Sequence, residues 1–184
     1  DEFGDIVIGG TGDDLLVGGA GADTLIGGTG FDSADYSGSG GAVTIDLVAG
    51  TGIGGDAQGD RLQGVERLIG SGFGDVLTGD GFGNVLIGGA GADRLTGGAG
   101  IDTADYSASS AAVNAVLGGT GSGGDAQGDV LAGIENLVGS GFGDVLVGDG
   151  AANALSGGAG DDRLAGKGGA DRLDGGAGID VADF

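Results

Sequence analysis

Aspartates recur at one fixed place of a short glycine-rich unit that runs through most of this sequence. The stretch Gly18–Ile26 reads GGAGADTLI, which fits a nine-residue frame of the form Gly-Gly-x-Gly-x-Asp-x-apolar-x. The frame returns at Gly9–Val17, at Gly88–Thr96 and at Gly157–Ala165. Carboxylates beside glycine turns, whose carbonyl oxygens we expect to point inward, are hard ligands that suit calcium better than the tight octahedron of magnesium. Zinc is disfavoured because the chain contains no histidine and no cysteine.

The unit also predicts the elements that position these aspartates. Its first six places are turn residues, in which glycine supplies backbone conformations that other residues avoid. Its last three places predict a short strand whose middle residue, at place eight, points inward. Two units then form one coil of 18 residues, and stacked coils give two parallel sheets with about 4.8 Å between strands. Leucine stands at the inward place at Leu16, Leu25, Leu62, Leu77, Leu86, Leu95, Leu131, Leu146, Leu155, Leu164 and Leu173.

Stacking at this spacing brings aspartates of successive coils together. We expect Asp14 to lie above Asp32, and Asp75 to lie between Asp93 and Asp60. Asp144, Asp162 and Asp180 form a further predicted column. Carboxylates stacked in this way repel one another where water is scarce, so a cation between them would stabilise the stack.

A longer period divides the chain into blocks. The phrase GGDAQGD at Gly54–Asp60 returns 69 residues later at Gly123–Asp129. The closing phrases FDSADY, IDTADY and IDVADF predict three blocks, 1–36, 37–106 and 107–184, with insertions at 37–54 and 107–123. Because the first block starts inside a unit, we expect a slice of a longer repetitive protein with flanking domains.

These repeated units resemble the RTX (repeats-in-toxin), or haemolysin-type, calcium-binding nonapeptide repeat. The resemblance implies an all-β fold, a right-handed parallel β-roll of stacked coils that holds several calcium ions between its turns. It also implies type I secretion of an unfolded chain that folds when it meets calcium outside the cell. The implied ligands are the sixth-place carboxylates and the carbonyl oxygens of turn glycines. The carboxylates are those of Asp5, Asp14, Asp23, Asp32, Asp60, Asp75, Asp93, Asp102, Asp129, Asp144, Asp162, Asp171 and Asp180. The glycines are Gly10, Gly12, Gly19, Gly21, Gly28, Gly30, Gly89, Gly91, Gly98, Gly100, Gly158, Gly160, Gly176 and Gly178.

Some units depart from the frame. Asn84 and Asn153 replace the sixth-place aspartate, which predicts weaker or differently built sites. The stretches GVERLI at Gly64 and GIENLV at Gly133 lack three turn residues, so we expect no normal site there. The stretch AVTIDLV, residues 42–48, alternates apolar and polar residues and predicts a conventional strand, with a counterpart at residues 112–118. The rings of Tyr36, Tyr106 and Phe184 are expected to fill the place of leucine and close the end of a stack.

Composition limits the classes of partner. The net charge of -22 and only six basic residues exclude a patch that could neutralise nucleic-acid phosphates. No apolar run reaches the roughly 18 residues that a membrane span needs. Glycine accounts for 52 of the 184 residues, but hydrophobic residues make up 39%, which is too many for a solvated tail.

Three functions remain open on the sequence. The first is a calcium-binding structural module of a secreted or cell-surface protein, with no catalytic residues. The second is a polysaccharide-binding module, similar in outline to the accessory modules of secreted alginate epimerases. The third is an enzyme, for which adjacent acids such as Asp161–Asp162 could suggest a glycosidase pair. We expect no enzyme, because the chain has no histidine, no cysteine and no serine–base constellation.

Overall fold

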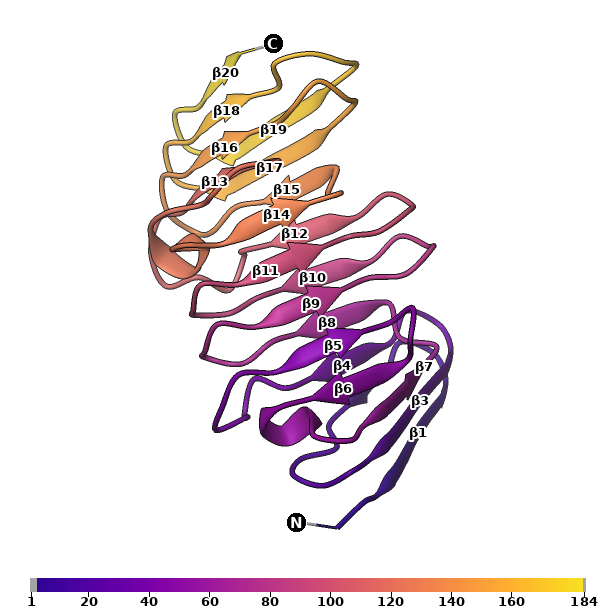
Figure 1. Cartoon of the computed structure of the whole chain (residues 1–184). Coiled ribbons are helices and arrows are strands. Elements are labelled where there is room, and N and C mark those ends of the chain that lie inside the picture. The colour runs from indigo at the N-terminus through magenta and orange to yellow at the C-terminus, as the bar shows by residue number, and fades with distance from the viewer. Residues whose placement is uncertain (1–2, 184) are drawn as a thin grey trace.

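The computed structural model describes residues 3–183. Short strands alternate between two faces of a stack, and each is joined to the next by a turn (Figure 1). Paired residues are one predicted coil apart in the sequence, since Ile6 pairs with Thr24 and Val85 pairs with Thr103, both in parallel. The fold is therefore a parallel β-roll, as the glycine-rich units predict.

Three sheets make up the roll. Sheet A contains, in spatial order, β1 (Ile6–Thr11), β3 (Thr24–Thr29), β7 (Arg61–Gln63), β6 (Thr51–Ile53), β5 (Thr44–Asp46), β9 (Val76–Thr78), β11 (Arg94–Thr96) and β14 (Val130–Ala132). Sheet C contains β13 (Asn114–Val116), β16 (Val145–Val147), β18 (Arg163–Ala165) and β20 (Val181–Asp183). Sheet B contains β19 (Arg172–Ala177), β17 (Ala154–Ala159), β15 (Asn136–Val138), β12 (Thr103–Asp105), β10 (Val85–Ile87), β8 (Arg67–Ile69), β4 (Ser33–Asp35) and β2 (Leu15–Leu16). Outside β5–β7 and β13–β14, strands of sheet A or C thus alternate along the chain with strands of sheet B.

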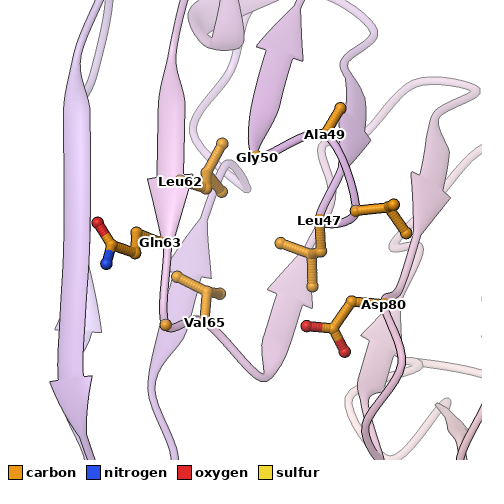
Figure 2. Close-up of a pocket in the computed structure, with 9 residues that line it drawn as sticks. Leu47, Ala49, Gly50, Leu62, Gln63, Val65 and Asp80 are labelled. Atoms are coloured by element: carbon orange, nitrogen blue, oxygen red, sulfur yellow. The ribbon is translucent and has the colours of Figure 1, made fainter.

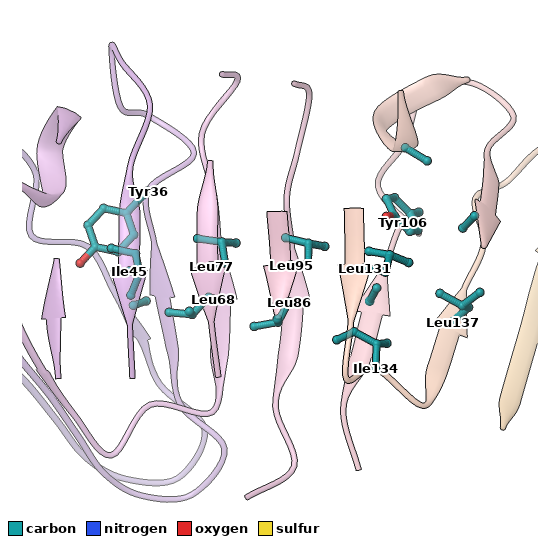
Figure 3. Close-up of a cluster of buried hydrophobic side chains, with 14 of the residues drawn as sticks. Tyr36, Ile45, Leu68, Leu77, Leu86, Leu95, Tyr106, Leu131, Ile134 and Leu137 are labelled. Carbon is teal, nitrogen blue, oxygen red and sulfur yellow. The ribbon is translucent and has the colours of Figure 1, made fainter. Parts of the chain in front are cut away.

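The core is a column of aliphatic side chains between the sheets (Figure 3). Most strands have three residues, and only the middle side chain is buried, as in β10 and β16. This middle residue is the predicted inward leucine, and Leu77, Leu86 and Leu95 are fully buried. Leu173, in the last coil, is partly buried. Fully burying a leucine contributes roughly 1.5–3 kcal/mol, so these leucines are the main apolar contribution of each coil.

Glycine in the turns allows successive coils to approach closely. Gly28 and Gly30 have φ angles of 114° and 142°, which side chains of L-residues rarely permit. A Cβ atom at either position would also collide with the carbonyl oxygen of the glycine one coil below, Gly10 or Gly12. The repeated glycines are therefore required by both backbone conformation and space.

The first insertion adds two strands to one face only. β5 pairs with β9 in parallel, and β6 runs antiparallel to both β5 and β7. Sheet A consequently has β7, β6 and β5 between β3 and β9, where sheet B has only β8 between β4 and β10. The expected contact of Asp75 with Asp60 is therefore wrong, because the hairpin of β5 and β6 separates their strands. A short 3-10 helix, η1 (Gly55–Ala57), follows the hairpin.

The second insertion repeats this arrangement less regularly. β13 pairs with β16, and η2 (Gly124–Ala126) precedes β14. The return segment forms only two isolated antiparallel bridges, Asn114 with Ser122 and Thr120 with Val130. Sheet A therefore ends at β14, and β13 starts sheet C.

The tyrosines that close the predicted blocks lie inside the roll. The side chains of Tyr36 and Tyr106 are each only 3% exposed and belong to the continuous core (Figure 3). The sheets continue past both residues. The third closing residue of the pattern, Phe184, lies outside the described residues.

Candidate metal centres

The sixth-place aspartates form hydrogen-bonded ladders along both edges of the roll. The backbone N–H of Asp14 donates to Oδ1 of Asp32 at 2.9 Å, one coil of 18 residues above it. The N–H of Asp75 donates to Oδ1 of Asp93 at 2.8 Å in the same way. The predicted stacking of these two pairs is therefore confirmed, and one oxygen of each upper carboxylate is oriented by the coil below.

The insertions break these ladders into segments. On the A edge, where turns lead into sheets A and C, the segments are Asp5–Asp23–Asp60, Val43–Asp75–Asp93–Asp129 and Val113–Asp144–Asp162–Asp180. On the B edge, where turns lead into sheet B, they are Asp14–Asp32–Glu66, Asn84–Asp102–Glu135 and Asn153–Asp171. Each link joins a backbone N–H to a side-chain oxygen of the next member. The predicted column of Asp144, Asp162 and Asp180 is one of these segments.

Many of these carboxylates keep one oxygen without a partner. The Oδ2 atoms concerned are those of Asp14, Asp23, Asp32, Asp93, Asp102 and Asp162. All six residues belong to turns with glycine at both of the first two places, and all except the half-buried Asp14 are at most 1% exposed. A buried anionic oxygen without a hydrogen bond is costly, so each is a candidate cation ligand.

Backbone carbonyl oxygens converge on the same points. A Cβ atom at Gly157 would touch Oδ2 of Asp162 and would lie 2.6 Å from the carbonyl oxygen of Gly175, one coil above. A Cβ atom at Gly9 would lie 2.5 Å from Oδ2 of Asp14 and 2.7 Å from the carbonyl oxygen of Gly27. The absence of a side chain thus leaves a cradle lined by one carboxylate oxygen and one carbonyl oxygen, the donor set that calcium prefers.

The predicted glycine ligands occupy the second and fourth places of these turns. All of them have positive φ angles, between 83° at Gly19 and 149° at Gly91. In residues 3–183, no three acidic, histidine or cysteine side chains gather closely enough to hold a metal by themselves. A bound cation would therefore need carbonyl oxygens as well as carboxylates.

In a second class of turn, a backbone N–H of the same turn donates a hydrogen bond to the sixth-place side chain. In the GSGFGD turns, Ser71 donates its N–H to Oδ2 of Asp75 at 2.5 Å, and Ser140 does the same to Asp144. In the GDGFGN turn at Gly79, Asp80 donates its N–H to Oδ1 of Asn84 at 2.8 Å. The second residue of these turns is not glycine, and its N–H is a hydrogen-bond partner for the sixth-place oxygen. Asn153 is capped by Asp149 in the same way.

Two further aspartates are capped by the buried tyrosines. The hydroxyl of Tyr36 donates to Oδ2 of Asp60 at 2.9 Å, and that of Tyr106 donates to Oδ2 of Asp129 at 3.0 Å. Asp60 and Asp129 end their ladder segments, because their own N–H groups donate to Ala57 and Ala126. The tyrosines thus close the ladders on the A edge, while the sheets continue.

Burial raises the pKa of several ladder carboxylates. It raises the pKa of Asp93 to about 7 and that of Asp129 to about 6, with further upward contributions from neighbouring aspartates. Burial is also the main cause of the raised pKa values of Asp60, Asp102 and Asp162. The single salt bridge found between described residues joins Arg172 to Asp174 on the surface. Basic side chains therefore do not neutralise the ladders.

Glu66 and Glu135 occupy ladder positions that the nine-residue frame does not assign to them. Their Oε2 atoms accept the N–H groups of Asp32 and Asp102 at 2.8 and 2.9 Å. The signal in the sequence is an acid directly before a strand in both shortened turns.

Beside the first of these turns, a hollow of about 240 Å³ opens toward the β5–β6 hairpin, where Leu47, Leu62 and Val65 surround it (Figure 2).

The glycine turns of this β-roll bring buried carboxylate oxygens and carbonyl oxygens together between successive coils. These features define a class of repeat proteins that can bind cations between their coils. The model of the RTX calcium-binding nonapeptide repeat matches the chain in four copies, at residues 1–34, 69–104, 129–164 and 147–182. These copies cover more than half of the chain, so it belongs to this family and is a calcium-binding repeat module. No curated protein matches the chain. Within the described part, no helix is long and apolar enough to cross a membrane.

Proposed function

We propose that this chain is a non-catalytic RTX β-roll module of a secreted or cell-surface protein, which folds outside the cell as it binds several calcium ions. Its ligands are the sixth-place carboxylates of the glycine-rich turns and the carbonyl oxygens of the adjacent coils. The module serves as a structural element of a longer chain, and calcium controls whether it is folded.

One observation carries the proposal. The turns of the GGxGxD type bury a carboxylate oxygen that has no hydrogen-bond donor, as at Asp93 and Asp162. Four turns with serine or aspartate at the second place supply that donor themselves, as Ser71 does for Asp75. The missing partner is therefore confined to the turns that match the calcium-binding frame, which is the pattern that cation ligation requires.

Calcium-dependent folding follows from the energetics of such a chain. Fixing the backbone costs about 1–2 kcal/mol per residue, and glycine loses more freedom than other residues. Each coil buries little more than two inward side chains against that cost. A site occupied at ten times its dissociation constant adds roughly 1.4 kcal/mol, so about six sites contribute roughly 8 kcal/mol. Because each cation joins two coils, one site orders the next, and the transition is cooperative.

The extracellular location rests on the family and on calcium availability. Extracellular calcium modules have dissociation constants of about 10⁻⁴–10⁻³ M. A module in this range stays unfolded in the low-calcium cytoplasm, which suits export of an unfolded chain through a type I system. Export of the chain behind a type I secretion signal, with folding detected only in calcium-containing medium, is the expected result. Folding inside the producing cell would contradict this part of the proposal.

Isothermal titration of the metal-free chain tests the binding itself. We expect several calcium ions per chain with cooperative binding, and weak binding of magnesium at the same concentrations. Binding of magnesium as strong as that of calcium would contradict the assignment, because the flexible oxygen cage would then not be selective.

Polysaccharide binding is a second candidate because of one surface feature. The guanidinium of Arg67 lies 5.3 Å from the centre of the Phe31 ring, and its buried Nε–H has no partner. These residues line a hollow of about 350 Å³ together with Asp13, Asp14 and Ser33. An aromatic face beside hydrogen-bonding groups suits a sugar ring. A glycan array in calcium tests this function, and binding that Arg67→Ala does not weaken would contradict this location.

A further inference from the structure

The shortened turns Gly64–Glu66 and Gly133–Glu135 connect β7 to β8 and β14 to β15. The frame predicts no normal calcium site at either turn, because three residues are missing. Gly64–Glu66 also lies outside the stretches that match the family model. The structure nevertheless places both turns in the B-edge ladder, each directly above a buried aspartate.

Three hydrogen bonds attach the first shortened turn to Asp32. The N–H of Asp32 donates to Oε2 of Glu66 at 2.8 Å. In return, the N–H groups of Glu66 and Arg67 donate to the carbonyl oxygen of Asp32 at 3.0 and 2.9 Å. The extra methylene group of glutamate thus compensates for the shorter turn, because its carboxylate reaches the position that a sixth-place aspartate occupies elsewhere.

The second shortened turn repeats these contacts. The N–H of Asp102 donates to Oε2 of Glu135 at 2.9 Å. The N–H groups of Glu135 and Asn136 donate to the carbonyl oxygen of Asp102 at 3.1 and 2.9 Å. Two copies of the turn, far apart in the sequence, therefore form the same geometry.

An unpartnered oxygen points into each of these places. Asp32 and Asp102 are 1% and 0% exposed, and their Oδ2 atoms have no hydrogen-bond partner. A Cβ atom at Gly27 would lie 2.5 Å from Oδ2 of Asp32 and would collide with the carbonyl oxygen of Gly64. At Gly97, a Cβ atom would lie 2.6 Å from Oδ2 of Asp102 and would collide with the carbonyl oxygen of Gly133.

These cradles match the one between regular turns. At Gly157, Oδ2 of Asp162 converges with the carbonyl oxygen of Gly175, the first residue of the unit one coil above. At the shortened turns, the carbonyl oxygens of Gly64 and Gly133 take the place of Gly175. The carboxylate of the following glutamate adds a second negative charge beside the cradle.

We propose that each shortened turn completes a calcium site, one between Asp32 and the Gly64–Glu66 turn and one between Asp102 and the Gly133–Glu135 turn. This inference rests on the calcium-binding function proposed above. Each site joins the coil before an insertion to the coil after it. Calcium there would link the two ends of the inserted segment that contains β5 and β6, or of the one that contains β13. The shortened turns are then the places where calcium holds the blocks together.

The test compares calcium stoichiometry in two double variants. Glu66→Gln with Glu135→Gln removes one charge at each shortened turn and keeps the side-chain size. Asp35→Asn with Asp105→Asn serves as the matched control. It also removes two charges, from half-buried aspartates that follow Asp32 and Asp102 in the sequence and lie outside the shortened turns. Calcium bound per chain is measured by equilibrium dialysis at a free calcium concentration that just saturates the parent chain, with folding checked by circular dichroism.

We expect the glutamine variant to bind two fewer calcium ions per chain, or to bind two of them at least tenfold more weakly, and the control to match the parent. Glu66→Asp with Glu135→Asp keeps the charge but shortens the reach, and we expect the same loss. Equal stoichiometry and affinity in the glutamine variant and the control would overturn the inference while leaving calcium binding by the regular turns intact. A parent chain that binds no calcium would instead overturn the proposed function.

If the glutamine double variant does not fold, the single variants Glu66→Gln and Glu135→Gln are titrated separately. Each is expected to lose one ion. An unchanged count in both would overturn the inference.

Discussion

The backbone N–H of Asp144 donates to Oδ1 of Asp162 at 2.7 Å, while Oδ2 of the same carboxylate is buried and has no partner. The two oxygens therefore have different roles. The first is fixed by the coil below, so the carboxylate is oriented before any cation arrives. The second remains available as a ligand, and the binding free energy does not have to include the cost of orienting the side chain.

Removing a carboxylate from the middle of a ladder should affect calcium binding more than removing one from its end. Asp162 accepts a hydrogen bond from the N–H of Asp144 and donates its own N–H to Asp180. The exposed Asp5, in contrast, begins its segment, and Asp23 is its one ladder neighbour among residues 3–183. Asp162→Ala should lower both the stoichiometry and the affinity measured by titration calorimetry, and Asp5→Ala should lower them less. Equal effects of the two variants would contradict ligands shared between stacked coils.

Filling a cradle should block calcium without changing any acidic residue. A Cβ atom at Gly157 would occupy the space between Asp162 and Gly175, whereas one at Gly150 would meet nothing within 4 Å. Neither glycine has a positive φ angle, so alanine is compatible with the local backbone dihedral angles at both positions, and the two substitutions differ in the space around the new Cβ atom. Gly157→Ala should therefore weaken calcium binding at least tenfold at one site, and Gly150→Ala should bind as the parent does. Matching titrations for the two variants would show that the cradle is not the site.

Much of the fold could be predicted from the repeat alone. The distance of 18 residues between Asp14 and Asp32, and the inward direction of Leu86, follow from a period that is local and repeated. The position of β5 inside residues 42–48 follows from alternation of apolar and polar residues. These features depend on contacts that every coil makes in the same way.

Contacts across the insertions could not be predicted in this way. The pairing of β5 with β9 separates Asp60 from Asp75, and it depends on a hairpin that has no counterpart in the repeat. The ladder position of Glu66 depends on side-chain reach, which a frame defined by residue type at place six does not include. The tyrosine cap on Asp60 likewise joins residues 24 apart in the sequence and lies outside the nine-residue pattern.

Acidification should favour the fold in the absence of calcium. Burial raises the pKa of Asp93 to about 7 and that of Asp129 to about 6, above the ordinary value of 3.8. At pH values between these raised pKa values and 3.8, the two aspartates are protonated in the folded chain but ionised in the unfolded chain. Folding therefore becomes more favourable as the pH falls from about 7.5 to 4.5. The β signal of the metal-free chain in circular dichroism should rise over this range. A signal that stays flat or falls would show that the burial of charged carboxylates does not oppose the metal-free fold.

Calcium should reverse that dependence. A calcium ion bound by these carboxylates would stabilise them as anions, so we expect the pKa of a bound group to fall below that of the unfolded chain. The stability that calcium adds is present above that unfolded value and is lost as the pH drops through the lowered one. In saturating calcium, the melting temperature should therefore be lower at pH 3 than at pH 7. Equal melting temperatures would contradict carboxylate ligation.

The tyrosine cap should contribute to stability in the calcium-loaded state. Tyr106→Phe removes the hydroxyl that donates to Oδ2 of Asp129 and leaves a buried acceptor without a partner. We expect a loss of about 1–3 kcal/mol in the free energy of unfolding, measured by urea titration in saturating calcium. Ser107→Ala, which removes a hydroxyl from the exposed neighbouring residue, should change it by less than about 0.5 kcal/mol. Equal small changes in the two variants would mean that the cap does not stabilise the ladder end.

We infer that calcium decides whether this chain is folded. Far-ultraviolet circular dichroism of the chain, first with a chelator at neutral pH and then with calcium added in steps to millimolar concentrations, tests it most directly. We expect an unfolded spectrum in chelator and a steep, cooperative gain of β signal as calcium is added, with magnesium giving no such gain. A chelated sample that already shows the complete β signal and a sharp thermal transition would contradict it.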